Sequence, residues 1–153
     1  MKIKHIAITA LFSILMYNNS IAQGIGDTKY TIELRQGRPD QINNLKGGQT
    51  SYIYNFKTDH AIAYSFNRRG YVFQITEMEP FSSVYSLRSE FNKRVSNMKK
   101  RYSLVPHTDS APYNQGDGAT FLAEDGHFIM IQIGSFDQKP FLMTNEYNIG
   151  LEQ

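Results

Sequence analysis

One long amphipathic helix is the strongest pattern in this chain. Apolar residues recur at steps of three or four from position 83 to 102, and charged or polar residues fill the positions between them. The apolar stripe consists of Val84, Leu87, Phe91, Val95, Met98 and Tyr102. Such a stripe predicts a helix over 83–102 that buries one face, with Ser82 or Ser83 as the N-terminal cap.

Alternating apolar positions predict strands on both sides of this helix. Three precede it, over 50–56, 61–66 and 70–76, and three follow it, over 119–124, 127–135 and 141–147. The links within each group are mostly short, and Asp125-Gly126 is typical of a tight hairpin. Short links favour antiparallel meanders.

The segment 28–36 has two interpretations. Tyr30, Ile32 and Leu34 alternate as in a strand, but Asp27 or Thr28 could cap a short helix whose end is marked by Gly37 and Pro39. The helix is favoured, followed by a turn over 37–40 and a polar loop over 43–49. The predicted fold is therefore α+β, with antiparallel meanders packed against the long helix in the order α-βββ-α-βββ.

The first 22 residues have the form of a secretory signal. Lys2 and Lys4 precede an apolar run, and Ala22 ends the segment after a polar stretch. The run over 6–16 is too short to cross about 30 Å of hydrocarbon. We therefore expect cleavage before Gln23, export to the periplasm or the exterior, no transmembrane segment in the mature chain, and a single domain over 23–153.

Charge and composition narrow the function classes. Without Lys2 and Lys4, the 16 basic residues fall to 14, which equals the 14 acidic ones. An electrically neutral chain is a poor candidate for nucleic-acid binding. Because the chain has no cysteine, no disulfide stabilises it, and its ten Phe and ten Tyr supply the material for a core.

Part of the chain resembles a family of small exported modules. The segment 34–40 (LRQGRPD), the strands 52–54 and 64–66, and Gly70-Tyr71-Val72 are similar to the SmpA/OmlA-type modules. The resemblance covers about 27–76 and implies a helix, a G-x-P turn and a meander, as in the β-lactamase-inhibitor-protein-like fold. It also implies binding to proteins of the cell envelope and no catalysis, although the family's lipoprotein cysteine is absent here.

Candidate chemical groups are few. His107, Asp109, Asp117 and His127 could meet as a hydrolytic or metal-binding cluster, but they match no known catalytic or metal-ligand spacing. The stretch around Asn114 also lacks the alternating acids of a calcium loop. We therefore expect no metal and no cofactor.

Tyr52, Tyr54, Tyr64 and Tyr71 could form an aromatic platform for a sugar or a peptide. The simpler interpretation is that aromatic residues favour strands and pack beneath a helix. In that case the four tyrosines are core residues.

The loop over 104–118 is the predicted contact surface. Its prolines and glycines limit regular structure, yet it holds apolar residues that a solvated linker does not need. The predicted binding residues are Val105, His107, Asp109 and Tyr113. We expect a noncatalytic binding protein of the bacterial envelope or exterior, whose partner is another envelope or secreted protein that contacts this loop or a free sheet edge. The alternative is a small hydrolase that uses His107 or His127 with Asp109 or Asp117.

Overall fold

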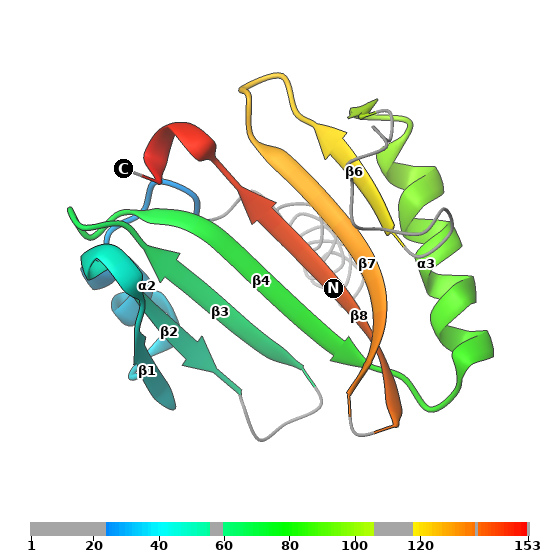
Figure 1. Ribbon diagram of the computed structural model, residues 1–153, viewed down its shortest axis with the longest axis horizontal. Helices are drawn as coiled ribbons and strands as arrows, with labels where there is room; N and C mark the ends of the chain where they lie inside the picture. Colours follow the sequence, from blue (N-terminus) through cyan, green and yellow to red (C-terminus); the bar gives the residue numbers. More distant parts are fainter. Residues whose placement is uncertain (1–23, 56–59, 106–117, 137, 153) are drawn as a thin grey trace, which may run out of the picture.

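The computed structural model describes residues 24–55, 60–105, 118–136 and 138–152. They form an α+β fold with one antiparallel sheet of eight strands (Figure 1). The first half contains α2 (Lys29–Gln36), β1 (Gln41–Asn44), a 3-10 turn (Lys46–Gly48), β2 (Thr50–Tyr54), β3 (Ala61–Phe66) and β4 (Val72–Pro80). The second half contains α3 (Val84–Met98), β5 (Ser103–Leu104), β6 (Gly118–Leu122), β7 (Phe128–Phe136), β8 (Lys139–Tyr147) and a 3-10 turn (Ile149–Leu151). Within the described ranges, no helix is long and apolar enough to cross a membrane.

The sheet consists of two meanders joined at their inner strands. The strand order is β1-β2-β3-β4-β8-β7-β6-β5, so β8 returns to the middle of the sheet and pairs with β4 (Figure 1). This antiparallel pairing runs from Gln74 opposite Tyr147 to Pro80 opposite Phe141. The two halves therefore share one continuous set of backbone hydrogen bonds.

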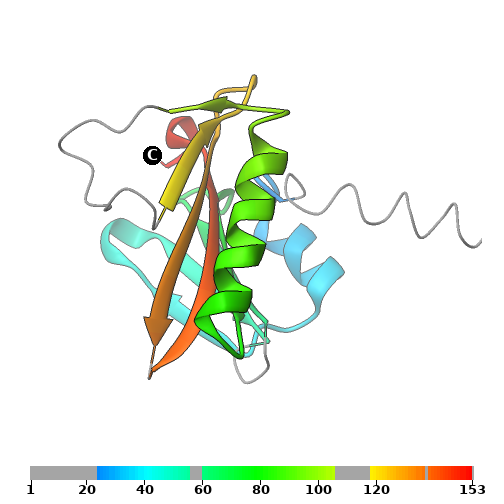
Figure 2. The same ribbon diagram turned by 90° about the vertical axis from the view of Figure 1, so that its right-hand side faces the viewer.

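Both helices lie on the same face of the sheet. Ile75, Glu146 and Ile129 are direct neighbours across β4, β8 and β7, so their side chains point to one face. Ile75 packs in the cluster beneath α2, and Ile129 packs in the cluster beneath α3. Figure 2 shows the two helices on one side of the sheet. The other face has no helix over it in the described part of the chain.

The helix predicted over 28–36 is confirmed as α2. The Thr28 side chain accepts a hydrogen bond from the Thr31 amide at 3.2 Å, and Gly37 ends the helix with a positive φ of 82°. Ile32 is fully buried, while Tyr30 and Leu34 are exposed. Ile32 is the one buried residue of α2, so the alternating residues do not share a buried strand face and the strand interpretation of this segment is wrong.

Helix α3 buries most of the predicted stripe. Ser83 caps it by accepting a hydrogen bond from the Ser86 amide at 3.1 Å. Leu87, Phe91 and Met98 are buried against apolar residues of β6, β7 and β8: Ala119, Phe121, Ile129, Ile131 and Leu142. The first residue of the predicted stripe, Val84, is exposed and lies outside this cluster.

The helix ends at Met98, earlier than the predicted position 102. The amides of Lys100 and Arg101 bond to carbonyls three residues back, which tightens the chain into a turn. The chain then enters β5, where Ser103 and Leu104 pair with β6. Residues 103 and 104 pair with β6 and are therefore extended, so the helix has to end before them.

The predicted order of three strands in each half is wrong, because the described residues of each half form four. Strand β1 (Gln41–Asn44) overlaps the first two residues of the predicted polar loop over 43–49, and β5 consists of two residues. Both are edge strands with mostly exposed residues, so neither carries the alternation that reveals a half-buried strand. Strand β4 also ends at Pro80 instead of position 76.

The hairpin between β6 and β7 has a three-residue loop instead of the two-residue turn suggested by Asp125-Gly126. The Ala123 amide donates to the His127 carbonyl at 2.9 Å, which closes the loop around Glu124, Asp125 and Gly126. Gly126 has a φ of 84°, the left-handed conformation that three-residue hairpin loops place at this position. This loop sets the position of His127 at the start of β7.

We predict that Phe91→Ala lowers the free energy of unfolding by about 3–5 kcal/mol, because it leaves a cavity beneath α3. Chemical denaturation measures this change. The control is Tyr85→Ala on the same helix, where the side chain is 85% exposed and the change should be below about 0.5 kcal/mol. Equal effects of the two substitutions would contradict the packing of α3.

Candidate functional site

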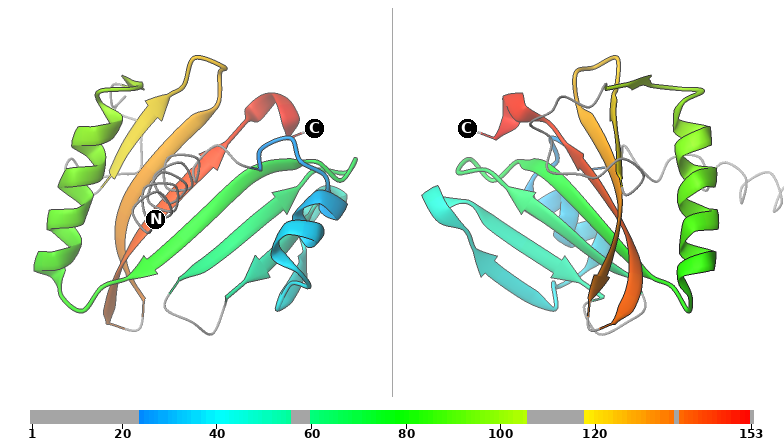
Figure 3. Two further views of the ribbon diagram at one scale, coloured as in Figure 1. Left: turned by 180° about the vertical axis from the view of Figure 1, so that it is seen from behind. Right: turned by 45° about the vertical axis from the view of Figure 1, so that its right-hand side comes forward.

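Acidic side chains occupy the middle of the helix-bearing face. On β4, Glu77 and Glu79 follow Ile75 with the alternation of a strand, and on β8 Glu146 lies opposite Ile75. Figure 3 shows α2 and α3 near the two ends of the sheet, with β4 and β8 between them. We call Glu77, Glu79 and Glu146 the acidic strip. It separates the apolar cluster beneath α2 from the one beneath α3.

A hollow of about 420 Å³ opens beside the acidic strip. Its floor includes Glu77 and Thr144, which are direct neighbours on β4 and β8. Its wall includes Arg94 of α3 and Arg101 in the turn that follows the helix. The hollow therefore has the Glu77 carboxylate and two guanidinium groups in its lining.

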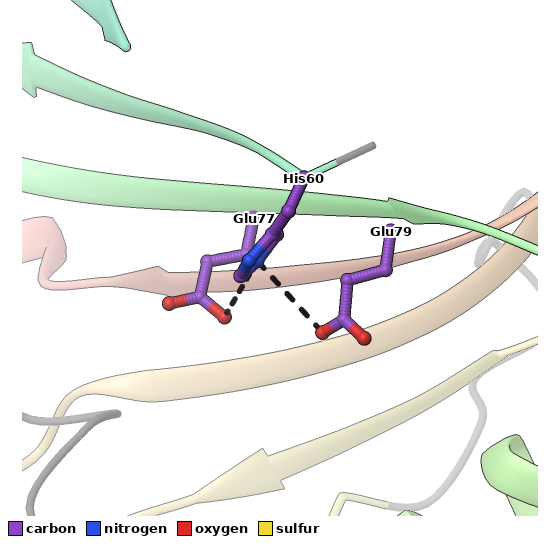
Figure 4. Close-up of side chains that lie close together, drawn as sticks. All are labelled: His60, Glu77 and Glu79. Carbon is purple, nitrogen blue, oxygen red and sulfur yellow. Dashed lines mark ion pairs between the residues drawn. The ribbon is translucent and has the colours of Figure 1, made fainter. Parts of the chain in front are cut away.

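His60 joins two glutamates of the strip in one cluster (Figure 4). Its Nε2 atom lies 3.9 Å from Oε2 of Glu77 and 3.9 Å from Oε1 of Glu79. Because Ala61 pairs with Met78, the preceding residue His60 comes to the same end of β4 as Glu79. One nitrogen and two oxygen atoms lie within 4.8 Å of one another. Figure 4 shows the imidazole between the two carboxylates.

Arg94 connects α3 to this cluster. Its Nη2 atom lies 2.8 Å from the Glu79 carboxylate, and its Nε atom lies 3.0 Å from Oε1 of Glu90. Burial acts to raise the pKa of Glu90, but the hydrogen bond and charge of Arg94 outweigh it and lower that pKa. Arg94 is thus shared between two carboxylates and holds the Glu79 side chain in place.

Glu77 is the less compensated acid of the cluster. Burial raises its pKa, and the charge of Glu79 raises it further. His60 and Arg94 lower this pKa only in part. The ionised form of Glu77 is therefore costly in this position, and a positive group beside it would stabilise that form.

Glu146 is the most buried acid of the strip, with a side chain only 3% exposed. Burial raises its pKa to about 8, and the charges of Asp125 and Glu77 also raise it. Nε2 of His127 lies 3.0 Å from Oε1 of Glu146 without hydrogen-bond geometry, and Oε2 has no hydrogen-bond partner among the described residues. Nδ1 of His127 contacts the carboxylate of Asp125. Asp125, His127 and Glu146 thus form a chain from the hairpin loop into the sheet.

The structure describes two of the residues singled out from the sequence as site candidates. Val105 follows β5, is half-buried, and donates its amide hydrogen to the Thr120 carbonyl at 2.9 Å. His127 contacts Asp125 and Glu146, two acids that were not proposed as its partners. His107, Asp109, Tyr113, Asn114 and Asp117 lie outside the described residues.

Three of the four tyrosines considered as an aromatic platform are core residues. Tyr52, Tyr54 and Tyr64 are buried with Ile32 beneath α2, while Tyr71 is exposed. Burial removes the three rings from contact with a ligand. The core interpretation therefore holds for them.

The acidic strip and His60 were not predicted from the sequence. The third predicted strand ends at position 76, although the alternation continues through Glu77, Met78 and Glu79. Two glutamates at alternate positions of a strand share one face, which is the available signal. Their meeting with His60 depends on the register between β3 and β4, and neither segment specifies that register alone.

The helix-free face carries an apolar groove of about 500 Å³. We call it the helix-free groove and define it by Ile53, Ala61, Ala63, Met78, Pro80 and Phe141, with Lys139 beside them. Ala61 and Ala63 are small and lie on one strand, which lowers the floor of the groove. The Phe141 ring lies over Gly134 of β7, where an added Cβ would come within 2.6 Å of it.

We predict that Glu146→Gln changes the pH dependence of stability. The folded-state pKa of about 8 is above the ordinary value of 4.5, so the folded protein retains a proton that the unfolded chain loses as the pH rises. The stability that this proton contributes is complete below about pH 4.5 and is lost as the pH approaches 8. Each pKa unit corresponds to about 1.4 kcal/mol.

We compare the free energy of unfolding of the Glu146→Gln variant with that of the unmodified protein at each pH. The difference, variant minus unmodified protein, should rise by at least about 1.4 kcal/mol between about pH 5 and pH 8. Urea denaturation at several pH values measures the difference. Glu124→Gln, at an exposed position, is the control and should show no such trend. A gap that stays constant with pH would contradict the unfavourable burial of Glu146.

Comparison with known proteins finds a solved structure of similar fold and no matching family model. No family model matches the chain, and no curated protein matches it. A solved structure of a cysteine-rich secretory protein (SAV1118) from Staphylococcus aureus is similar in fold, with a TM-score of 0.50 and 10% sequence identity. The match covers 87% of this chain and 47% of that one, so this chain corresponds to about half of the neighbour's length. At this identity the likeness concerns the fold alone.

Proposed function

We propose that this chain is a noncatalytic binding protein, exported to the bacterial envelope or exterior, that holds an apolar segment of another envelope or secreted protein. The helix-free groove is the proposed contact. The observation that carries this proposal is an apolar groove of about 500 Å³ on a sheet face that no helix covers in the described part of the chain. Its size lies within the range of about 300–1,000 Å³ that is common for ligand sites.

The exposure of these side chains is the physical reason. Apolar surface in water is unfavourable, and contiguous apolar patches on soluble proteins commonly mark interaction sites. Met78 is exposed on β4, the strand next to Ala61 and Ala63 of β3. Covering this surface with an apolar partner would remove it from water.

The shape and charge of the groove define the partner. The small side chains of Ala61 and Ala63 leave room for larger apolar side chains of the incoming segment. Lys139, the first residue of β8, is the charged residue of the lining, so a carboxylate next to the apolar segment would complement it. The proposed partner is therefore a protein segment with apolar residues and a neighbouring Asp or Glu.

Two sequence features support the same class of function. The leader over 1–22 predicts export, and the resemblance of 27–76 to SmpA/OmlA-type modules implies binding of envelope proteins. The loop residues Val105, His107, Asp109 and Tyr113 remain predicted partner contacts. The groove adds a contact on the face of the sheet that does not depend on this loop.

The hydrolase alternative has less support from the described residues. A general base has to reach the proton that it removes. The His127 side chain is only 8% exposed and lies between Asp125 and Glu146. Such an enclosed imidazole is better suited to a structural contact than to catalysis in solution.

The proposal predicts that Ala63→Arg abolishes partner binding without unfolding the protein. A displayed library of apolar peptides that each contain one acidic residue is selected against the unmodified protein, and the enriched peptides are then measured with the variants. Ala63→Arg fills the groove with a long charged side chain and should weaken binding at least tenfold. Met78→Arg should do the same from the neighbouring strand.

The matched control is Tyr85→Arg, which adds the same charge on α3, away from the groove. It should leave peptide binding unchanged. If no peptide binds, or if all three variants bind equally, the groove is not the contact. Self-association that is lost in Ala63→Arg would assign the groove to a second copy of the chain and would also overturn the proposal.

A further inference from the structure

We infer that His60, Glu77 and Glu79 form a binding site for one divalent transition-metal ion, and that Zn²⁺ matches their ligand set. This site lies on the helix-bearing face, opposite the helix-free groove. The inference does not depend on the proposed partner. It departs from the sequence-based expectation of no metal, because these three residues come together through the pairing of β3 with β4.

The three ligand atoms are slightly farther apart than in an occupied zinc site, so they would move closer together when the ion binds. Zn²⁺ lies about 2.0–2.2 Å from nitrogen and oxygen ligands, so tetrahedral ligand atoms are about 3.4 Å apart. Nε2 of His60 lies 3.9 Å from an oxygen of each glutamate. All three ligand atoms lie within 4.8 Å of one another. Small side-chain rotations would bring them to coordination distance.

The residue types also favour a transition metal. Imidazole is a common ligand of zinc, and carboxylate oxygens complete mixed nitrogen and oxygen sites. Three protein ligands leave a fourth position for water, as in open zinc sites. The His60 side chain is 54% exposed, and the hollow beside Glu77 is wide enough to admit water. The ion would therefore have a route from solvent to the ligands.

The local charge gives an independent reason for a cation. Glu146 lies next to the cluster on β8, is 3% exposed, and has one carboxylate oxygen without a hydrogen-bond partner among the described residues. Burial and the charges of Asp125 and Glu77 disfavour the ionised form of Glu146. Beside this buried carboxyl group, Glu77 and Glu79 place like charges on one face of β4 within a single cluster. A divalent ion at Glu77 and Glu79 would offset this repulsion.

Arg94 would act as a supporting residue and not as a ligand. Its Nη2 atom binds the Glu79 carboxylate at 2.8 Å, and its Nε atom binds Glu90. Hydrogen bonds to a ligating carboxylate orient it toward the metal. Arg94 therefore holds both oxygens of Glu79 from the α3 side, and one of them, Oε1, also faces His60 (Figure 4).

Isothermal titration calorimetry of the tag-free protein with ZnCl₂ tests this inference. We expect one equivalent of Zn²⁺ to bind, and His60→Ala and Glu77→Gln each to weaken binding about tenfold or more. Zn²⁺ should also raise the melting temperature, because an ion that binds the native state stabilises it, and a chelator should reverse the rise. Substitution by Co²⁺ should give the visible absorption of a tetrahedral nitrogen and oxygen site.

Glu124→Gln is the control, since it removes an exposed carboxylate away from the cluster. It should bind Zn²⁺ as the unmodified protein does. Melting in the presence of chelator establishes that the variants are folded, and neither His60 nor Glu77 belongs to an apolar cluster. The inference is overturned if the protein binds no Zn²⁺, if either cluster variant binds it with unchanged affinity, or if Glu124→Gln weakens binding equally.

Discussion

The pairing of β4 with β8 is the contact on which the rest of the structure depends. The chain leaves β4, forms α3 and three further strands, and returns to place β8 beside it. This closure joins two meanders into one sheet and aligns Ile75, Glu146 and Ile129 on one face. Both helices then cover that face, each above its own half. The hydrophobic burial beneath the helices supplies the stabilisation, and the long-range pairing decides where it occurs.

The same pairing creates the acidic strip. Each helix covers the apolar residues of its own meander, so the seam between the meanders is where polar side chains can remain. Glu77 and Glu146 are nevertheless partly or fully enclosed there, and their raised pKa values show that the enclosure is costly for the ionised forms. A sheet built for stability alone would place apolar residues at these positions. The proposed metal at His60, Glu77 and Glu79 is a reason for carboxylates at the seam.

The two faces of the sheet present different kinds of surface. The helix-bearing face holds both apolar clusters and the acidic strip. The opposite face exposes the helix-free groove, whose apolar lining comes from β2, β3, β4 and β8. Because strand side chains alternate between faces, neighbouring residues such as Glu77 and Met78 belong to different surfaces. One strand can thus contribute to a charged cluster and to an apolar groove.

The local features of this protein follow from its sequence alone. The apolar period of the region around Leu87 and Phe91 specifies a helix with one buried face, and the cap at Thr28 with the glycine at position 37 marks α2. Alternation around Tyr52, Tyr64 and Ile131 identifies central strands because those strands have one face in the core. The tertiary structure alone decided the edge strands, the β4–β8 closure and the meeting of His60 with Glu77. Those features depend on the register between segments far apart in the chain, and a local pattern of polarity carries no information on which segment lies alongside.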